Sequence, residues 1–166
     1  MSTDGVVVRP TTEDDWQQVR ALRLEMLADT PMAYGETLAS ALAHDETVWR
    51  TRARRGTDSA QLAVVAVAPD GRWVGAVGCV VLDGGPMLVS VYVAPSHRGR
   101  AAGVTDALLT CAEDWARPRG SIRLFVHEDN SRAQAAYRRR GYVATGANVP
   151  YDLDPTRREI EMAKEL

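Results

Sequence analysis

The sequence predicts an α/β fold in which a mixed, mostly antiparallel central sheet carries helices on both faces. One observation is a set of apolar, β-type segments over 62–93 that short Gly- and Pro-containing turns separate, which is typical of antiparallel hairpins. A second is an amphipathic helical pattern that starts at 104 and leads into another apolar strand at 121–127, as in a β-α-β crossover. The 166 residues are predicted to form one domain over 1–166, because neither a linker nor a repeat interrupts them.

Before the hairpins, the sequence predicts one strand and two helices. The strand covers 6–9, where consecutive valines precede an arginine. The first helix covers 13–28, because Thr12 and Asp15 resemble a capping box and apolar residues then recur at near-helical spacing. The second helix, over 37–55, is less periodic.

The middle of the chain predicts three strands and a helix. Segments 62–68 and 73–82 form a hairpin around a Pro-Asp-Gly turn, and a Gly-Gly-Pro turn then leads into the strand 87–93. The helix that follows presents apolar side chains at a 3.6-residue spacing and ends at Pro118 and Gly120. Its apolar face comprises Val104, Ala107, Leu108, Cys111 and Trp115.

The C-terminal part alternates strand and helix. A strand over 121–127 precedes a helix over 131–140, and strands over 142–147 and 158–163 follow. The predicted order therefore begins with antiparallel hairpins and has a parallel crossover in its middle, which is why we expect a mixed sheet.

Composition and charge describe an ordinary globular protein. Hydrophobic residues make up 45% and charged residues 25%, and the formal net charge is −2. That charge gives no global attraction to nucleic acid or anionic membranes, and no apolar run has the length of a membrane span. The N-terminal residues lack the basic and apolar regions of a signal peptide, so we expect a cytoplasmic protein. Cys79 and Cys111 lie in apolar patterns and are expected to be buried free thiols.

The segment 90–103 joins an apolar strand, a Pro-containing loop and the start of an amphipathic helix. Such a loop directs backbone N–H groups and a helix N-terminus toward one point, and this point attracts an anion. Arg98 and Arg100 add fixed positive charge beside it. The expected anion is a phosphate or pyrophosphate of a nucleotide-like cofactor. The segment contains neither a P-loop string nor a dinucleotide-binding Gly-x-Gly-x-x-Gly string, which excludes those two classes of site.

The six residues 98–103, Arg-Gly-Arg-Ala-Ala-Gly, resemble the acetyl-CoA signature of the GCN5-related N-acetyltransferase (GNAT) superfamily, Arg/Gln-x-x-Gly-x-Gly/Ala. Arg98 and Gly103 match that signature, whereas Ala101 stands where the family usually has glycine. An alanine costs roughly 1 kcal/mol relative to glycine if the position requires a positive φ angle. We expect cofactor binding to survive this departure.

A second block of residues supports the same family. Asn130 follows the strand 121–127, Tyr137 lies on the next predicted helix, and Gly141-Tyr142 ends the block. The superfamily has an asparagine, a tyrosine and a Gly-aromatic pair at these positions. The two blocks, over 90–142, therefore identify the sequence as similar to this superfamily, and the resemblance implies the acyl-CoA N-acyltransferase fold for nearly the whole chain.

The resemblance implies a role for each matching residue. Backbone groups of Val91-Tyr92-Val93, in particular those of Val91 and Val93, would bind the pantetheine arm and the thioester carbonyl, on a strand that is also part of the core. The loop Gly99-Arg100-Ala101-Ala102-Gly103-Val104 would hold the pyrophosphate, with a solvated loop as the alternative. Asn130 would bond the pantetheine amides and can also cap a helix. Tyr137 would be the general acid that protonates the departing thiolate, with core packing as its alternative.

The resemblance does not assign the general base. Some members of the superfamily carry a glutamate five positions before the asparagine, and Phe125 stands there in this chain. A base that acts through water on a partly neutral amine is an equal alternative. The candidates in the sequence are Glu36, His44, Glu46, His127 and Glu128.

The resemblance implies that the region between the first two helices forms a wall of the acceptor site. Tyr34, Glu36, Asp45 and Glu46 would form an acidic, partly aromatic wall there, which suits an amine cation. A solvated helix face is an equal interpretation of the same residues.

The resemblance implies an acetyl-CoA-dependent N-acetyltransferase that moves an acetyl group to a primary amine of a small molecule or peptide by direct transfer. The alternative is a non-catalytic acyl-CoA-binding module with the same fold. No metal is expected, because the 3 histidines have no ligand spacing with one another or with a cysteine. Nucleic acid and membrane are not expected partners, since the arginines of 138–140 point in different directions on a helix. A homodimer is compatible with the sequence, and the acceptor and the preferred acyl chain stay open.

Overall fold

The computed structural model describes residues 5–99 and 102–166, so Arg100 and Ala101 of the predicted cofactor loop lie outside the described residues. Within these ranges the strands form one seven-stranded sheet in the order β1-β2-β3-β4-β5-β7-β6. Its pairs are antiparallel except for β4 and β5, which run parallel. The strands are β1 (Val7–Pro10), β2 (Leu62–Val67), β3 (Trp73–Leu82), β4 (Gly85–Val93), β5 (Ser121–His127), β6 (Val143–Tyr151) and β7 (Asp154–Glu165).

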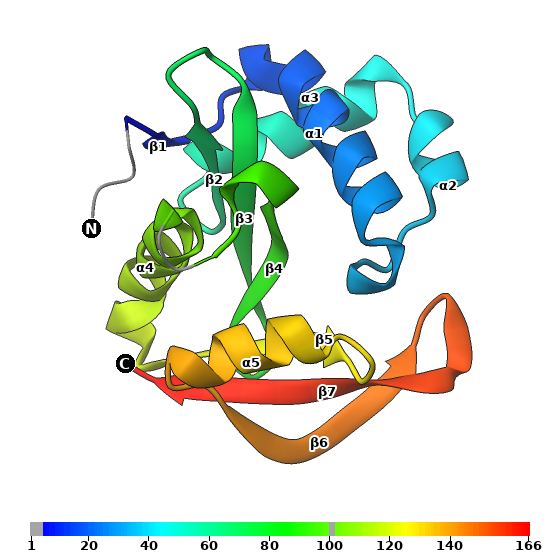
Figure 1. Cartoon of the computed structure of the whole chain (residues 1–166), viewed down its shortest axis with the longest axis vertical. Helices are drawn as coiled ribbons and strands as arrows, with labels where there is room; N and C mark the ends of the chain where they lie inside the picture. Colours follow the sequence, from blue (N-terminus) through cyan, green and yellow to red (C-terminus); the bar gives the residue numbers. More distant parts are fainter. Residues whose placement is uncertain (1–4, 100–101) are drawn as a thin grey trace.

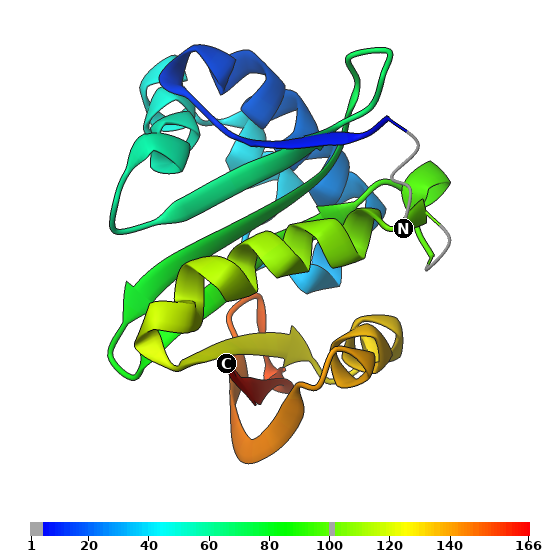
Figure 2. The same cartoon turned by 90° about the vertical axis from the view of Figure 1, so that its left-hand side faces the viewer.

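Helices cover both faces of the sheet, as the sequence predicts. The helices α1, α2 and α3 lie on one face of β2–β4, and α4 lies on the other (Figure 1, Figure 2). The end of α5 is joined to α4 by ion pairs from Arg140 to Glu113 at 2.7 Å and to Asp106 at 3.3 Å. The helices are α1 (Trp16–Asp29), α2 (Leu38–Leu42), α3 (Glu46–Ala53), α4 (Val104–Ala116) and α5 (Ser131–Arg139).

The prediction of one helix over 37–55 is wrong, because two helices, α2 and α3, occupy this segment. Each has its own side-chain cap: Thr37 accepts a hydrogen bond from the Ser40 N–H, and Asp45 accepts one from the Val48 N–H. A capping side chain in extended backbone starts a new helix, and so the chain turns between α2 and α3. The last two strands also extend beyond their predicted ranges, to Tyr151 in β6 and from Asp154 to Glu165 in β7.

The core lies between the sheet and the helices on its two faces. Trp49 of α3 is 1% exposed, and Leu108 and Leu109 of α4 are fully buried. Cys79 is buried and Cys111 is partly buried, and both are free thiols, so only Cys79 matches the expected burial in full. Among the described residues, no helix is both long and apolar enough to cross a membrane.

The sheet opens between β4 and β5. These two strands share a single register pair, Met87 with Arg123, and diverge beyond it (Figure 1). On its other edge, β4 has an irregular register with β3 between Ala76 and Gly78. Ser90, opposite this irregularity, has a φ angle of 54°, which is rare for a non-glycine residue. A bulge of this kind bends a strand and redirects its side chains, so the opening of the sheet starts at a bent strand.

Candidate active site

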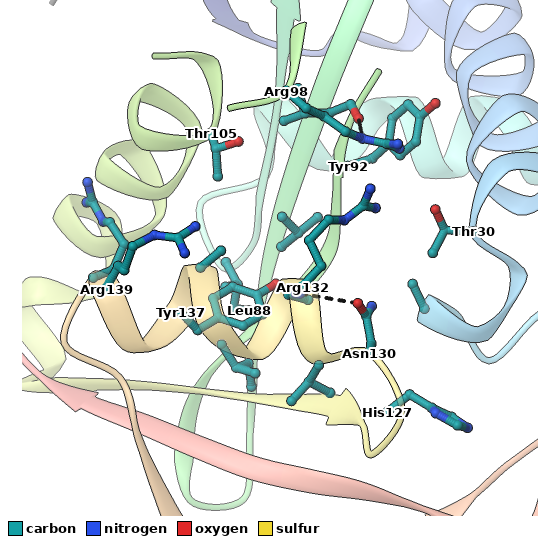
Figure 3. Close-up of a pocket in the computed structure, with 18 of the residues that line it drawn as sticks. Thr30, Leu88, Tyr92, Arg98, Thr105, His127, Asn130, Arg132, Tyr137 and Arg139 are labelled. Atoms are coloured by element: carbon teal, nitrogen blue, oxygen red, sulfur yellow. Dashed lines mark hydrogen bonds between the residues drawn. The ribbon is translucent and has the colours of Figure 1, made fainter. Parts of the chain in front are cut away.

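A cavity of about 460 Å³ fills the opening between β4 and β5 (Figure 3). Because β4 has no strand partner on its β5 side after Met87, its backbone faces the cavity. Two carbonyls of this stretch accept side-chain hydrogen bonds, Val91 from the Tyr34 hydroxyl at 2.9 Å and Val93 from Arg98 Nε at 2.8 Å. The cavity is therefore bounded by an open strand edge whose position two side chains fix.

The structure brings most of the predicted cofactor residues to this cavity. Its lining includes Val91, Tyr92, Val93, Arg98, Gly99, Asn130 and Tyr137. Ala102, Gly103 and Val104 do not line it, and the Val104 side chain is fully buried in the core. Their proposed contact with a phosphate uses backbone N–H groups, so core packing of a side chain does not conflict with it.

The N-terminus of α4 lies at the edge of the cavity. Gly103 precedes the helix with a φ angle of 68°, and its carbonyl accepts the Ala107 N–H at 3.0 Å. Thr105 and Asp106, in the first turn of α4, line the cavity. The unpaired N–H groups and the positive dipole end of this 13-residue helix therefore face the place where the sequence predicts a pyrophosphate.

Arg98 is already engaged within the protein. Besides the Val93 carbonyl, its guanidinium binds the Asp29 carboxylate at the end of α1, and it lies over the Tyr92 ring with its Cζ 5.7 Å from the centroid. The charge of Arg98 is thus largely balanced by Asp29, and the side chain ties the cofactor loop to β4 and α1. Its role in binding the cofactor directly stays a prediction.

Two arginines of α5 that the sequence did not single out line the same cavity. Arg132 extends from α5 toward Tyr92, and Arg139 lies near the N-terminal turns of α4 (Figure 3). Neither has a hydrogen bond or ion pair with any other described residue. By contrast, Arg138 binds Gln134 at 3.2 Å and Arg140 binds Glu113 at 2.7 Å. Consecutive arginines thus point in different directions, as expected, and only the tertiary structure shows which of them are available to a phosphate.

Asn130 caps a helix, which is the second role that the sequence analysis gave it. Its side-chain oxygen accepts the Ala133 N–H at 3.2 Å and so caps α5. The side chain also lines the cavity, and its amide nitrogen has no partner among the described residues. Asn130 can therefore cap α5 and donate to a ligand at the same time.

Tyr137 lies on the face of α5 that borders the cavity. Its ring packs edge-on against Tyr142, with the centroids 5.6 Å apart, and its hydroxyl points into the cavity (Figure 3). Burial raises the pKa of Tyr137 above its ordinary value of 10.0. The hydroxyl has no protein hydrogen-bond partner in the described ranges, so it is a protonated donor that is free to serve a ligand.

Most candidates for the general base are engaged elsewhere. Glu36 is bound by Arg52, Arg23 and His44, which hold its pKa at about 2 against the effect of burial. The Nε2 atom of His44 lies 2.7 Å from a Glu36 oxygen. Glu46 pairs with Arg50 on the surface at 2.6 Å. None of these three candidates lines the cavity.

The other two candidates lie at the end of β5. His127 lines the cavity and is 5% exposed, and its Nδ1 accepts the Asp129 N–H at 3.2 Å. A neutral ring in this arrangement carries its proton on Nε2 and offers no second lone pair. Glu128 accepts hydrogen bonds or ion pairs from Arg158 and Arg157. Among the five candidates only His127 therefore lies at the cavity, and the water-mediated route stays the alternative.

Glu159 is a carboxylate near this end of the cavity that the sequence analysis missed. It lies opposite His127 in the β5–β7 register and has no hydrogen bond or ion pair with a described residue. Burial, and then the nearby Asp152, raise the pKa of Glu159. No signal in the sequence could have identified it, since glutamates at alternate positions in a strand usually mark a solvated face.

The expected acidic acceptor wall is wrong for three of its four residues. Tyr34 lines the cavity, but Glu36, Asp45 and Glu46 do not. Their carboxylates are used by arginines or, for Asp45, as the cap of α3.

Among the described residues, no group of three or more His, Cys, Asp and Glu side chains has the arrangement of a metal site. Neither Cys79 nor Cys111 lines the cavity. Burial raises the pKa of the Cys79 thiol to about 12, so it is not a thiolate at neutral pH. The polar side chains around the cavity are hydroxyl, amide and guanidinium groups, with the carboxylate of Asp106 and the imidazole of His127.

An open parallel strand pair, a helix N-terminus and a tyrosine at one cavity are the features that the sequence led us to expect of an acyl-CoA-dependent transferase. The sequence model of the acetyltransferase (GNAT) family matches residues 22–142. The chain therefore belongs to the acetyltransferase (GNAT) family. The predicted family, the predicted fold and, at the level of the family, the predicted enzyme class are confirmed.

Individual proteins support this assignment. The chain is 36% identical over 95 residues to a streptothricin acetyltransferase of Streptomyces lavendulae, a match that covers 55% of the chain and 49% of that relative. The chain thus spans about half the length of this curated relative. A GCN5-related N-acetyltransferase from Kribbella flavida has a TM-score of 0.76 at 21% identity and covers 99% and 100% of the two chains. The PaiA N-acetyltransferase of Thermoplasma acidophilum, solved with coenzyme A, has a TM-score of 0.69 at 18% identity over 100% of both chains.

Proposed function

We propose that this protein transfers an acetyl group from acetyl-CoA directly to a primary amine of a small molecule or peptide. The observation that carries the proposal is the unpartnered Tyr137 hydroxyl, which points into the cavity opened by β4 and β5. An acyl transfer from a thioester needs a proton for the departing thiolate, and a buried phenol supplies one. Acetyl-CoA fits the cavity because an open strand edge and a cationic end lie in it together.

Different groups of the described residues are expected to bind different parts of the cofactor. The N-terminus of α4, with Arg132 and Arg139, presents positive charge to the phosphates. The free edge of β4 offers backbone groups to the extended pantetheine arm, as one strand does to another. The Asn130 amide can bond to the pantetheine from the opposite side. In this proposal the thioester lies between β4 and Tyr137.

Direct transfer to the amine is part of this proposal, because it needs no covalent intermediate on the protein. The cavity lining in the described part of the chain contains no cysteine and no serine. The bond that breaks is between the acetyl carbonyl carbon and the cofactor sulfur, and the bond that forms joins this carbon to the amine nitrogen. The amine loses a proton to a base or to water, and Tyr137 gives a proton to the sulfur.

The nature of the acceptor is supported by the curated relative. Its name, a streptothricin acetyltransferase, describes a small-molecule amine as the acceptor of that protein. Since only about half of that relative is matched, a peptide amine is kept beside a small molecule as the acceptor of this chain.

A second function is favoured by one observation. Of the predicted bases only His127 lines the cavity, and its Nδ1 is already engaged, which is compatible with an acyl-CoA-binding module that does not turn over. Incubation with acetyl-CoA and a panel of primary amines, with release of free thiol as the readout, separates the two. Thiol release that depends on the amine supports the transferase. Tight binding of acetyl-CoA with no release for any amine supports the binding module.

Arg139→Gln is expected to weaken acetyl-CoA binding about tenfold, because hydrogen bonds to charged groups contribute about 1.5–3 kcal/mol each. Calorimetric titration of the protein with acetyl-CoA measures the effect. Arg138→Gln is the control, since Arg138 is bonded to Gln134 and does not line the cavity. Equal affinities for the two variants would show that Arg139 does not contact the phosphates.

A further inference from the structure

A second cavity, of about 220 Å³, lies on the opposite side of β4 from Tyr137. It is enclosed by α1, the end of α3 and the face of β2–β4, and it shares no lining residue with the cofactor cavity. Most of its wall is aliphatic, with Val19, Leu22, Val77 and Val89 among the residues that form it. In the described part of the chain, its charged lining residues are Arg23, Arg52 and Arg55, with no acidic residue.

The positive charge of these arginines is not balanced. Arg23 and Arg52 share one carboxylate, Glu36, with nitrogen–oxygen distances of 2.9 Å from each. Arg55 has no hydrogen bond or ion pair from its side chain to any described residue. Burial, with Arg52 and Arg23 nearby, lowers the pKa of Arg55, which shows that the three guanidiniums act on one another. A cavity with more cations than anions favours an anionic ligand.

Two of the guanidiniums are held in fixed positions. Arg23 lies over the Tyr34 ring with its Cζ 4.9 Å from the centroid, and Arg52 lies over Trp49 at the same distance. Arg52 also binds both Glu36 oxygens, at 2.9 and 3.0 Å. Arg55 is therefore the member of the set that is free to form the two parallel hydrogen bonds that a guanidinium makes with a carboxylate.

The cavity adjoins the predicted thioester position. Ser90, the residue with the positive φ angle, lines it, whereas the next residue, Val91, lines the cofactor cavity. Tyr34 links the two, because Arg23 stacks on its ring and its hydroxyl binds the Val91 carbonyl at 2.9 Å. The Ser90–Val91 backbone thus borders both cavities, and we take it as the path by which a ligand in the second cavity reaches the thioester. The Tyr34 ring lies between the two cavities, so several bonds must separate the amine of such a ligand from its other end.

We propose that the acceptor carries a carboxylate, several bonds from its amine, and that Arg55 with Arg23 and Arg52 binds it in this cavity. The substrate class is thus an amine with an apolar spacer and an anionic end. This inference rests on the proposed function, since it assigns the acceptor of the same reaction. The aliphatic wall holds the spacer, and the three arginines select against acceptors that lack the anion.

The test compares ω-amino acids of increasing length, from β-alanine to 6-aminohexanoate, with their amides as acetyl acceptors. We expect at least one of the longer acids to have a kcat/KM about tenfold or more above that of its amide. In Arg55→Gln the preference should fall to nearly one. Arg54→Gln is the matched control, because Arg54 is an exposed neighbour outside the cavity and should keep the preference.

A binding measurement keeps the inference independent of turnover. Calorimetry of the wild-type protein with hexanoate should show binding that hexanamide lacks and that Arg55→Gln weakens about tenfold. Acids and amides that are acetylated equally well, or hexanoate that does not bind, would overturn the inference while the proposed function stands. Hexanoate that binds through Arg55, with no acetylation of any amine, would instead overturn the proposed function and leave an anion-binding cavity.

Discussion

Tyr137→Phe is expected to lower kcat by at least about tenfold, because general acid catalysis contributes about 10²–10⁴ in rate. The substitution removes the hydroxyl that points into the cavity and keeps the ring that packs against Tyr142. The affinity for acetyl-CoA should therefore change little, so that the loss falls on kcat. Steady-state kinetics with the best acceptor, and calorimetry with acetyl-CoA, measure the two quantities.

Tyr142→Phe is the matched control for this result. Tyr142 belongs to the same ring pair and is 1% exposed. It does not line the cavity, so its variant should keep the wild-type kcat. If both variants turn over at the wild-type rate, Tyr137 is a core residue and the thiolate takes its proton from water or from the acceptor.

Burial of Tyr137 also determines the expected pH dependence. Its pKa is raised above the ordinary value of 10.0, so the phenol keeps its proton across the neutral range and beyond. We therefore expect that loss of the Tyr137 proton does not lower the kcat of the wild type below about pH 10. The alkaline side of the pH profile should then have the same shape in Tyr137→Phe. On the acid side of the pH profile, activity should rise with pH because the amine is deprotonated there.

Glu36→Gln is expected to destabilise the fold by about 2 kcal/mol, because partly buried arginines lose their shared carboxylate. The Glu36 side chain is 12% exposed, and Arg23, Arg52 and His44 surround it. Chemical unfolding at neutral pH measures the difference in the free energy of unfolding. Glu46→Gln, which breaks one exposed ion pair with Arg50, is the control and should have an effect below about 0.5 kcal/mol.

The same carboxylate contributes a pH-dependent term with a defined sign. Its pKa falls from an ordinary 4.5 to about 2 on folding, so its contribution is complete above pH 4.5 and is lost as the pH falls toward 2. The difference between wild type and Glu36→Gln should therefore shrink over this interval. A difference that stays constant down to pH 2 would show that packing, rather than charge, accounts for the role of Glu36.

The strands and the cofactor site could be predicted to a large extent because their signals are local. The strand from Gly85 to Val93, the helix from Val104 and the block from Asn130 to Tyr137 are each contiguous in sequence, and the fold preserves their order around one cavity. The break between α2 and α3 was not predicted. It depends on whether Thr37 and Asp45 use their side chains as caps, and apolar spacing does not report this.

The acceptor side of the molecule shows what only the tertiary structure decided. Through the resemblance, the sequence by itself indicated a strand, a loop and a tyrosine-bearing helix as the acyl-CoA site, since residues close in the chain carry those features. It could not determine which charges stay free, because Glu36 binds partners 13 and 16 positions away and so leaves the expected acidic wall. Arg55 and Arg139 are unpaired for the same reason: among the described residues, the fold brings no carboxylate within ion-pair distance of their guanidiniums. Ion pairing is decided by distance in space, and the three-dimensional packing of distant segments decides that distance.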